Sequence, residues 1–242
     1  MNEWFERGHV AIVTGGSRGL GKALARELLE RGLSVVIDGR NEAALQQAYR
    51  ELIAFGDVIA IAGDIADKDH AHALVAEARR LGRLDVLVNN ASTLGETPLP
   101  RIDQLTEETF NRIFAVNVFS PIHLIQHALP MMVRSGDLAT IVNITSDAGV
   151  EAYPAWGGYG ASKAALEHIS RVLAAETDNP NLRILVADPG DMNTDMHRDA
   201  IPEADPSSLG DPVDAARALM RAIAGMRARY ERVNLAPAGS AV

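Results

Sequence analysis

A phenol and an ammonium stand four positions apart in the stretch YGASK, where Tyr159 precedes Lys163. On an α-helix, positions i and i+4 lie on the same face, so the two side chains can meet. A nearby ammonium stabilises the phenolate form and lowers the pKa of a tyrosine, which is otherwise about 10. The pair therefore has the chemistry of a tuned proton donor, although a helix can also carry Tyr and Lys at this spacing by chance.

Two further polar residues precede this pair. Ser146 ends the apolar stretch ATIVNIT, 13 residues before Tyr159. Asn117 lies within FAVNVFS, where a side-chain amide among apolar residues needs a polar partner. Satisfied burial of that amide is the structural alternative to a catalytic role.

Apolar runs of strand length alternate with helical segments along the chain. The runs are rich in Val and Ile and nearly continuous in hydrophobicity, as in parallel strands buried on both faces. Strands are predicted at 9–14, 34–38, 57–63, 84–90, 139–145 and 182–188, with a short last one near 232–236. Helices are predicted in GLGKALARELLERG and near 41–55, 67–81, 106–133, 159–177 and 212–227. This order predicts one α/β domain over residues 1–242, a doubly wound parallel sheet (Rossmann fold) in three α/β/α layers.

Two segments interrupt the alternation, STLGETPLPRIDQ at 92–104 and GDMNTDMHRDAIPEADPSSLGDP at 190–212. Each follows a strand at its carboxyl end, where open α/β sheets bind ligands. The second is long for a connection in a compact domain, which favours a substrate lid at about 190–212. Disorder is the alternative.

The segment TGGSRGLG, residues 14–21, follows the first predicted strand and opens the first helix. Gly15, Gly19 and Gly21 stand where a tight turn, a close phosphate approach and helix packing need no Cβ. The helix N-terminus then offers free N–H groups to a pyrophosphate. Many strand-to-helix turns use glycine for geometry alone, so the later motifs decide between the two interpretations.

Those motifs resemble the single-domain short-chain dehydrogenases/reductases over roughly residues 9–195. They are TGGSRGLG, NNAS, VN, ITS, YGASK and PGDMNT, in the order of that family. The resemblance implies an oxidoreductase with Asn117, Ser146, Tyr159 and Lys163 as its catalytic residues.

The implied reaction explains these residue types. A hydride that reaches a carbonyl carbon builds negative charge on the carbonyl oxygen, which needs a proton as it forms. We expect Tyr159 to be the general acid in reduction and the general base in oxidation, with its pKa lowered by Lys163 and by the oxidised nicotinamide. Lys163 would also hold the nicotinamide ribose, Ser146 would hydrogen-bond the substrate oxygen, and Asn117 would fix a water linking Lys163 to solvent.

The resemblance also implies a cofactor site. Asp64 would hydrogen-bond the adenine edge with Ile65 against the ring, unless it serves only as a helix cap. Asn90 and Ala91 would border the adenosine ribose, and Ser92 replaces the glycine that the family usually has. The full predicted set is Gly15, Ser17, Arg18, Gly19, Leu20, Gly21, Arg40, Asp64, Ile65, Asn90, Ala91, Ser92, Tyr159, Lys163, Pro189, Gly190, Met192 and Thr194. In PGDMNT, Pro and Gly can alternatively serve only to turn the chain.

The end of the second strand, VVIDGRN, selects the cofactor in this family. An acidic residue there binds the adenosine ribose 2′-OH, whereas arginine pairs with a 2′-phosphate. Gly39 occupies the acidic position, Arg40 follows it, and Arg18 supplies a second cation, which favours NADP(H). If the register differs by one residue, Asp38 would take the ribose diol and the cofactor would be NAD(H). A solvated helix start is the structural alternative for Arg40.

Composition restricts the partners and the compartment. The formal net charge of −9 disfavours nucleic acid and an acidic carrier protein, since a phosphate backbone needs a basic face. No stretch approaches the roughly 18 apolar residues of a membrane span, and no signal peptide is predicted. The absence of cysteine suits a cytoplasmic protein. The long helices at 106–133 and 159–177 predict a homodimer or homotetramer, although the last residues, ERVNLAPAGSAV, depart from the family's Gly-rich end.

The function predicted from these residues is the NADP(H)-dependent interconversion of a carbonyl and a secondary alcohol. The alternatives are a 3-oxoacyl-thioester reductase, which uses the same chemistry, and a non-catalytic NADP-binding regulator. Asp147 and Asp191 either touch the substrate or only form turns. His70 and His72 are predicted to lie on a solvated helix face, outside any metal site.

Overall fold

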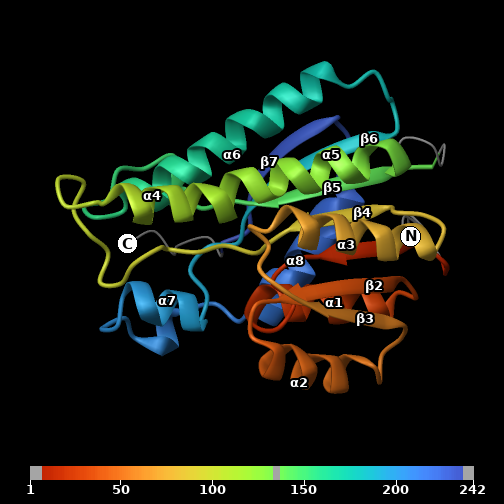
Figure 1. Ribbon diagram of the computed structural model, residues 1–242, viewed down its shortest axis with the longest axis horizontal. Coiled ribbons are helices and arrows are strands. Elements are labelled where there is room, and N and C mark those ends of the chain that lie inside the picture. Colours follow the sequence, from red (N-terminus) through yellow and green to blue (C-terminus); the bar gives the residue numbers. More distant parts are fainter. Residues whose placement is uncertain (1–6, 133–136, 237–242) are drawn as a thin grey trace.

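One parallel sheet forms the centre of the computed structural model, which describes residues 7–132 and 137–236 (Figure 1). Within those residues the strand order is β3-β2-β1-β4-β5-β6-β7, and every neighbouring pair is parallel. The strands are β1 Val10–Val13, β2 Ser34–Gly39, β3 Val58–Ala62, β4 Val86–Asn89, β5 Ala139–Ile144, β6 Leu182–Asp188 and β7 Tyr230–Asn234. The predicted doubly wound α/β fold of one domain is confirmed.

Helices cover both faces of this sheet. They are α1 Gly19–Glu30, α2 Glu42–Leu52, α3 Lys68–Arg80, α4 Glu107–Phe114, α5 Ser120–Met132, α6 Gly157–Glu176, α7 Asp195–Ala200 and α8 Pro212–Gly225. A π-helix, Ala115–Phe119, joins α4 to α5, and single 3₁₀ turns cover Asp147–Gly149 and Pro206–Ser208. One apolar cluster packs α1, α2 and α8 on one face, and a second packs α3, α5 and the end of α6 on the other.

Besides shifts of one to three residues at the ends of other elements, the predictions differ from the structure in the long helix, the last strand and the segment 190–212. The predicted helix at 106–133 is divided by the π-helix, and its residue 133 lies outside the described residues. The last strand runs two residues earlier than predicted, over Tyr230–Asn234, and residues 237–242 of the terminal stretch are also outside the described part. The segment 190–212 contains α7, the 3₁₀ turn Pro206–Ser208 and an isolated bridge between Met192 and Gly210, so it is folded.

The expectation that every strand is buried holds for the central strands alone. β1, β4 and β5 are buried throughout, whereas β3 and β7 at the two edges of the sheet are partly exposed. An edge strand has one neighbour instead of two, and hydrophobic continuity in the sequence does not reveal which strand lies at an edge.

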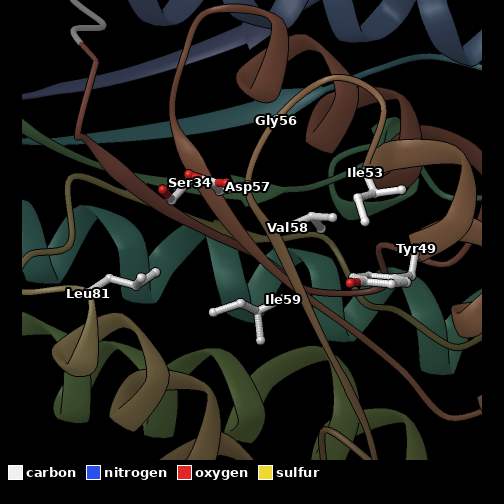
Figure 2. Close-up of a pocket in the computed structure, with 8 residues that line it drawn as sticks. All are labelled: Ser34, Tyr49, Ile53, Gly56, Asp57, Val58, Ile59 and Leu81. Atoms are coloured by element: carbon white, nitrogen blue, oxygen red, sulfur yellow. The ribbon is translucent and has the colours of Figure 1, made fainter.

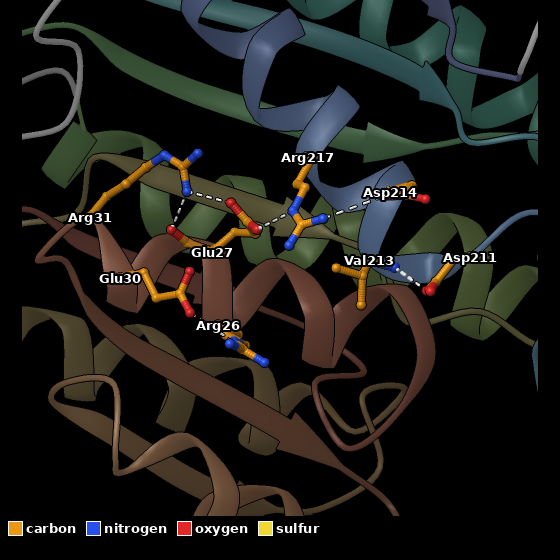
Figure 3. A network of polar contacts seen from close by, with 8 residues as sticks. All are labelled: Arg26, Glu27, Glu30, Arg31, Asp211, Val213, Asp214 and Arg217. Carbon is orange, nitrogen blue, oxygen red and sulfur yellow. Dashed lines mark hydrogen bonds and ion pairs between the residues drawn. The ribbon is translucent and has the colours of Figure 1, made fainter.

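A charged cluster joins α1 to α8. Glu27 is 7% exposed and accepts from Arg31 at 2.6 Å and from Arg217 of α8 at 3.3 Å (Figure 3). Asp211 caps α8 by accepting from the Val213 N–H at 2.8 Å. Glu27, Arg31 and Arg217 lie in the helical layer, and we assign their contacts to packing.

The strand order reverses between β1 and β4, because β2 and β3 lie on one side of β1 and the later strands on the other. In open α/β sheets, ligands bind beyond the carboxyl ends of the strands at such a point. The segments that follow β1, β4, β5 and β6 all contain predicted site residues. In the described part of the chain, no helix is long and apolar enough to span a bilayer.

Candidate active site

The Gly-rich turn between β1 and α1 needs residues without a Cβ. Gly15 and Gly19 adopt φ angles of +66° and +52°, in the region that favours glycine. A Cβ on Gly21 would lie 2.3 Å from the Gly15 carbonyl oxygen, so the helix can begin this close to the turn only with glycine there. The tight turn and the close helix packing expected of these glycines are therefore present, and the close phosphate approach stays a prediction.

The first turn of α1 is left open to a ligand. Asn41, Asp67, Thr106 and Asp211 cap the N-termini of α2, α3, α4 and α8 with side-chain oxygens. Arg18 stands at the N-cap of α1 without a side-chain cap, and the first turn has no acidic residue. Uncapped N–H groups and the positive end of the helix dipole form an anion site.

Asn90 and Ala91 connect β4 to this turn. The Asn90 side chain donates to the Thr14 carbonyl oxygen at 2.7 Å, and the backbone N–H groups of Asn90 and Ala91 donate to the Thr14 hydroxyl at 2.9 Å. Both residues therefore fix the position of the turn beside the central strands. Thr14 was absent from the predicted set, although a hydroxyl just before a Gly-rich turn is a readable signal.

Asp38 at the end of β2 has its carboxylate directed into the protein. One oxygen accepts from the Gly15 N–H at 2.6 Å and the other lies 3.0 Å from Nε2 of His70. Asp38 is 2% exposed and His70 is 8% exposed. The prediction of a solvated face is therefore wrong for His70, because α3 turns this ring toward β2.

The two predicted 2′-site cations are exposed. Arg40 makes no hydrogen bond or ion pair with the described part of the chain, although its charge helps to lower the pKa of Asp64. Arg18 pairs with Asp195 of α7 at 2.7 Å, with both side chains about half exposed. Such an exposed pair contributes little stability, so an anionic ligand can compete for Arg18.

Asp64 and Ile65 follow β3 near Arg40. Burial acts to raise the pKa of Asp64, but its hydrogen bond from the Ala66 N–H and its 2.6 Å contact with Arg112 outweigh that effect, and the pKa is lowered. Ile65 is 5% exposed. Asp67, and not Asp64, caps α3, which removes one structural alternative for Asp64.

Tyr159 and Lys163 both lie on the buried face of α6. Lys163 Nζ is 5.4 Å from the centre of the Tyr159 ring and donates to the Ile144 carbonyl oxygen at 2.9 Å. The small residues between them have a packing role, since a Cβ on Gly160 would lie 2.4 Å from the Ala148 carbonyl oxygen. Gly160 thus lets the end of β5 and its 3₁₀ turn approach the phenol.

Burial dominates the protonation of this pair. It raises the pKa of Tyr159, while hydrogen bonding with Ser92 and Ser146 acts to lower that pKa. It also lowers the pKa of Lys163 to about 8, partly offset by the Asp188 carboxylate. The expected lowering of the Tyr159 pKa is therefore reversed in the protein alone, because desolvation of the phenolate outweighs the hydrogen bonding of Ser92 and Ser146.

Ser146 lies at the start of the 3₁₀ turn after β5. Its hydroxyl donates to Asp147 at 2.9 Å, and Tyr153 donates to the other oxygen of the same carboxylate at 2.9 Å. Ser146 and Ser92 both affect the pKa of Tyr159, so hydroxyls from β4 and β5 converge on the phenol. Asp147 is exposed beside them.

Asn117 lies in the π-helix and is 1% exposed. Its side-chain oxygen accepts from Thr93 N–H at 2.9 Å and from Ser92 at 3.2 Å, and its nitrogen donates to Thr93 O at 3.0 Å and to Ser162 at 2.9 Å. The amide is thus saturated with protein partners, and it reaches Tyr159 only through Ser162, whose hydroxyl donates to the Tyr159 carbonyl oxygen. The predicted contact of this side chain with a water stays a prediction, and it would require one of these hydrogen bonds to be given up.

The segment after β6 connects both ends of the site. Gly190 has a φ of +73° and donates to Asp188 at 3.0 Å, while Pro189 is half-buried before it. Thr194 caps α7, and its methyl group would be 3.3 Å from a Cβ on Gly19. Further along, Met196 and Ala200 pack with Leu94, Ala148 and Tyr159 in an apolar cluster that also includes Leu99 and Trp156.

A family model described as short chain dehydrogenase matches residues 9–205. The chain belongs to the short chain dehydrogenase family. The matched residues include the Gly-rich turn, the four candidate catalytic residues and most of the segment 190–212, which contains α7.

Three similar proteins place the chain within this family. A rhamnolipid-biosynthesis 3-oxoacyl-[acyl-carrier-protein] reductase of Pseudomonas aeruginosa is 35% identical over 98% of this chain and 97% of its own length. A benzil reductase of Saccharomyces cerevisiae that forms (S)-benzoin is 36% identical over 79% of this chain and 74% of its own. The RhlG/NADP active-site complex of Pseudomonas aeruginosa superposes with a TM-score of 0.83, at 32% identity over 97% and 98% of the two chains.

Two buried carboxylates near the site of this short chain dehydrogenase were not singled out from the sequence. Asp188 ends β6, is 3% exposed and has its pKa raised by burial. Glu167 on α6 is 4% exposed, accepts from Thr145 at 2.8 Å and pairs with Arg232 of β7 at 3.0 Å. An acid at the end of an apolar strand was a readable signal for Asp188, whereas only the packing of α6 on β7 reveals the position of Glu167.

A hollow of about 240 Å³ lies away from the candidate site, toward the amino ends of the strands (Figure 2). It is open at the β3 edge, between Tyr49 and Ile53 of α2 and Leu81 after α3, close to the amino ends of β2 and β3. None of the candidate catalytic residues lines it. We therefore assign the chemistry to the carboxyl edge of the sheet.

Proposed function

We propose that this oxidoreductase uses NADP(H) to interconvert a carbonyl and a secondary alcohol, with Tyr159 as general acid and base. The observation that carries the proposal is the convergence of Tyr159, Lys163 and Ser146 at the carboxyl edge of the sheet, the same edge at which the N-terminus of α1 is left uncapped. A binding protein would have no need for a buried phenol held between hydroxyls and an ammonium.

The residues present fit a dinucleotide. Gly15 and Gly21 let the turn pack against Asn90 with no room for a Cβ, and the uncapped N–H groups of α1 suit a pyrophosphate. Asp64 and Ile65 would border the adenine, and Asn90, Ala91 and Ser92 the adenosine ribose. The backbone of Ser17 and Leu20 would face the phosphates, since the Leu20 side chain is in the core. Pro189, Gly190, Met192 and Thr194 would pass the nicotinamide amide.

The environment of Asp38 supports NADP(H) over NAD(H). Its carboxylate has Gly15 and His70 as partners and is 2% exposed, so it is withheld from a ribose diol. Arg40 and Arg18 are exposed cations at this edge, and they suit a 2′-phosphate. The NADP complex of the P. aeruginosa relative is consistent with this choice.

Reduction follows from the protonation states. The bound nicotinamide would supply a hydride at its C4 carbon. Tyr159, kept protonated at neutral pH by its raised pKa, would donate its proton to the carbonyl oxygen as negative charge forms there. Ser146 would donate a hydrogen bond to the same oxygen, and Lys163 would hold the nicotinamide ribose. In the oxidation direction Tyr159 must first lose its proton, so oxidation would be favoured at higher pH.

Asn117 would act through other groups. It fixes Thr93 and Ser92 after β4 and holds Ser162, whose hydroxyl donates to the Tyr159 carbonyl oxygen at 2.6 Å. We infer a positioning role for its side chain, which keeps the β4 loop and α6 in register around the phenol.

We further propose that residues 190–212 form the substrate lid. Met196 and Ala200 already pack against the cluster that contains Tyr159, and Arg18 pairs with Asp195 at the start of α7. The apolar lining favours a carbonyl carried on an apolar group. Asp147 and Asp191, both exposed near Tyr153, would disfavour an anionic substrate.

A 3-oxoacyl thioester is the second candidate substrate. The P. aeruginosa 3-oxoacyl-[acyl-carrier-protein] reductase aligns with nearly the whole chain, which favours it. The net charge of −9 opposes docking of an acidic carrier protein. Thioesters without the carrier, such as N-acetylcysteamine esters, would separate the chemistry from the docking.

The deciding experiment measures NADPH and NADH consumption with ketones, aldehydes and 3-oxoacyl thioesters, for wild type and Tyr159→Phe. We expect NADPH to be preferred, and the variant to bind NADP⁺ normally but turn over at least about a hundredfold slower. Equal rates in the variant would contradict the role of Tyr159. Cofactor binding without turnover across the whole panel would favour a regulator.

We propose a homodimer or homotetramer in a soluble, cytoplasmic setting. Phe119 at the end of the π-helix is 52% exposed and Val172 on α6 is 40% exposed, so both long helical segments present apolar side chains to solvent. Light scattering of the purified chain tests this directly, and a mass near 25.9 kDa would contradict it.

A further inference from the structure

The carboxylate of Asp38 and the imidazole of His70 form a buried pair beneath the Gly-rich turn. Asp38 comes from the carboxyl end of β2 and His70 from the first turn of α3, and the two are 32 positions apart in the sequence. Because an ionised carboxylate can only accept, Nε2 of His70 donates to it across the 3.0 Å contact. The pair is neither metal-binding nor part of the proton-transfer site.

The second oxygen of the Asp38 carboxylate is bound to the Gly-rich turn after β1. It accepts from the Gly15 N–H at 2.6 Å, and Gly15 has the positive φ that starts the turn. The Gly16 N–H also donates to the Asp38 carbonyl oxygen at 2.9 Å. His70 therefore reaches the phosphate turn through one intermediate side chain.

The space for the His70 ring is specific. A Cβ on Gly63 would lie 2.2 Å from Nδ1 and 2.5 Å from Cε1 of the ring. Any larger residue after β3 would push the imidazole away from Asp38. This independent feature indicates a place shaped for a ring at position 70.

The location matters because Asp38 is adjacent to Gly39 and Arg40, at the predicted 2′-site. A carboxylate that turned outward here would repel a 2′-phosphate and accept hydrogen bonds from a ribose diol. In the structure, the Gly15 N–H and the His70 ring hold the Asp38 carboxylate inward. The side chain of Arg40 is then the charged group that this end of β2 presents to a ligand.

We propose that His70 is a cofactor-specificity-determining residue, which holds the Asp38 carboxylate inside the protein and thereby preserves preference for the 2′-phosphorylated dinucleotide. The inference rests on the proposed NADP(H) site. His70 touches neither the dinucleotide nor the substrate, so its role is positional.

Without His70, one oxygen of a buried carboxylate loses its donor, and this unsatisfied acceptor favours rotation toward solvent. The rotated charge would lie near the 2′-position. The loss should therefore fall on NADP⁺ and spare NAD⁺, a pattern that general damage to the fold would not produce.

The test measures binding of NADP⁺ and NAD⁺ by titration calorimetry, which needs no turnover. We expect His70→Leu to lower the ratio of NADP⁺ to NAD⁺ affinity about tenfold. The double variant His70→Leu/Asp38→Asn should restore most of that ratio, because the rotated amide is neutral. His72→Leu, on the exposed side of the same helix, is the matched control and should keep the wild-type ratio.

Each result decides the inference. Equal losses for both dinucleotides, or no restoration in the double variant, would overturn it. If His70→Leu gives no cooperative melting transition, His70→Gln replaces it, because its neutral amide keeps a donor near Nε2 and should lower the ratio two- to threefold. A wild-type chain that binds both dinucleotides equally would instead refute the NADP(H) proposal.

Discussion

The two ends of the candidate site are built in opposite ways. At the cofactor end, the protein presents backbone N–H groups, an uncapped helix and the exposed Arg40. At the chemistry end, Tyr159 and Lys163 are buried, and Asn117 is saturated by protein partners. A site for a large anion depends on groups that the fold leaves unsatisfied, whereas proton transfer depends on groups that packing forces together.

This contrast gives different sensitivities to substitution. Changes at the chemistry end should affect turnover and stability together, because the same contacts serve both. Changes at the cofactor end should affect affinity for one ligand and leave the fold intact. The variants below test this difference from the largest expected effect to the smallest.

Gly160→Ala should cause the largest loss. The new Cβ would lie 2.4 Å from the Ala148 carbonyl oxygen, so the 3₁₀ turn with Ser146 must move away from Tyr159. We expect turnover to fall roughly a hundredfold, since a small displacement of a catalytic group can cost that much. The control is Ala161→Ser on the exposed side of α6, and a Gly160→Ala enzyme with normal kcat would contradict this packing role.

Lys163→Met should stabilise the fold at neutral pH. Below pH 8 the buried ammonium stays charged in the folded chain and bears its desolvation cost. We expect the variant to be more stable there, on the order of 1–3 kcal/mol by urea denaturation.

The pH dependence of that difference is the sharper measurement. The folded pKa of Lys163 is about 8, below the ordinary value of 10.5, so the unfolded chain binds more protons between these values. Wild-type stability should therefore rise relative to Lys163→Met from pH 8 to 10. Lys68→Met, at an exposed position on α3, is the control, and a constant difference would contradict the burial of charge.

Arg40→Ser should change affinity alone. Loss of a cation at a 2′-phosphate should raise the KM for NADPH about tenfold, near 1.4 kcal/mol, with less than a twofold change for NADH. Steady-state kinetics with both cofactors provides the measurement. Arg50→Ser, exposed in the last turn of α2, should change neither value. An equal rise in KM for both cofactors would contradict the assignment of Arg40 to the 2′-phosphate site.

Arg217→Ala should have the smallest effect. Its side chain is 55% exposed and lies 3.3 Å from Glu27, which retains Arg31 at 2.6 Å (Figure 3). We expect a loss of roughly 0.5 kcal/mol in the free energy of unfolding and unchanged kinetics. A loss above about 2 kcal/mol would mean that the α1–α8 cluster depends on Arg217.

Much of the fold could be read from local patterns. Continuous Val and Ile runs, separated by amphipathic helical segments, predicted the alternation of parallel strands and helices along the chain. The reason is that a strand covered on both faces must be apolar on both. The same patterns missed the π-helix around Asn117 and shifted β7 by two residues. The π-helix and the exact limits of an edge strand depend on tertiary contacts, which hydrophobic periodicity does not reveal.

The candidate site divides along the same line. The spacing of Tyr159 and Lys163 and the glycines of the first turn follow from local geometry, so the sequence by itself determined them. The direction in which the Tyr159 pKa shifts could not be predicted in this way. It depends on burial of the phenol, to which residues of the segment 190–212 contribute.

The sequence determined which chemical groups this chain contains and in what order, because residue types and their spacing are properties of the linear chain. Tertiary structure alone decided that His70 faces Asp38, that Asp38 faces inward, and that Asn117 has no free hydrogen-bonding capacity in its side chain. The physical reason is that hydrogen-bond partners and desolvation arise between segments distant in sequence, and they become defined only when those segments pack.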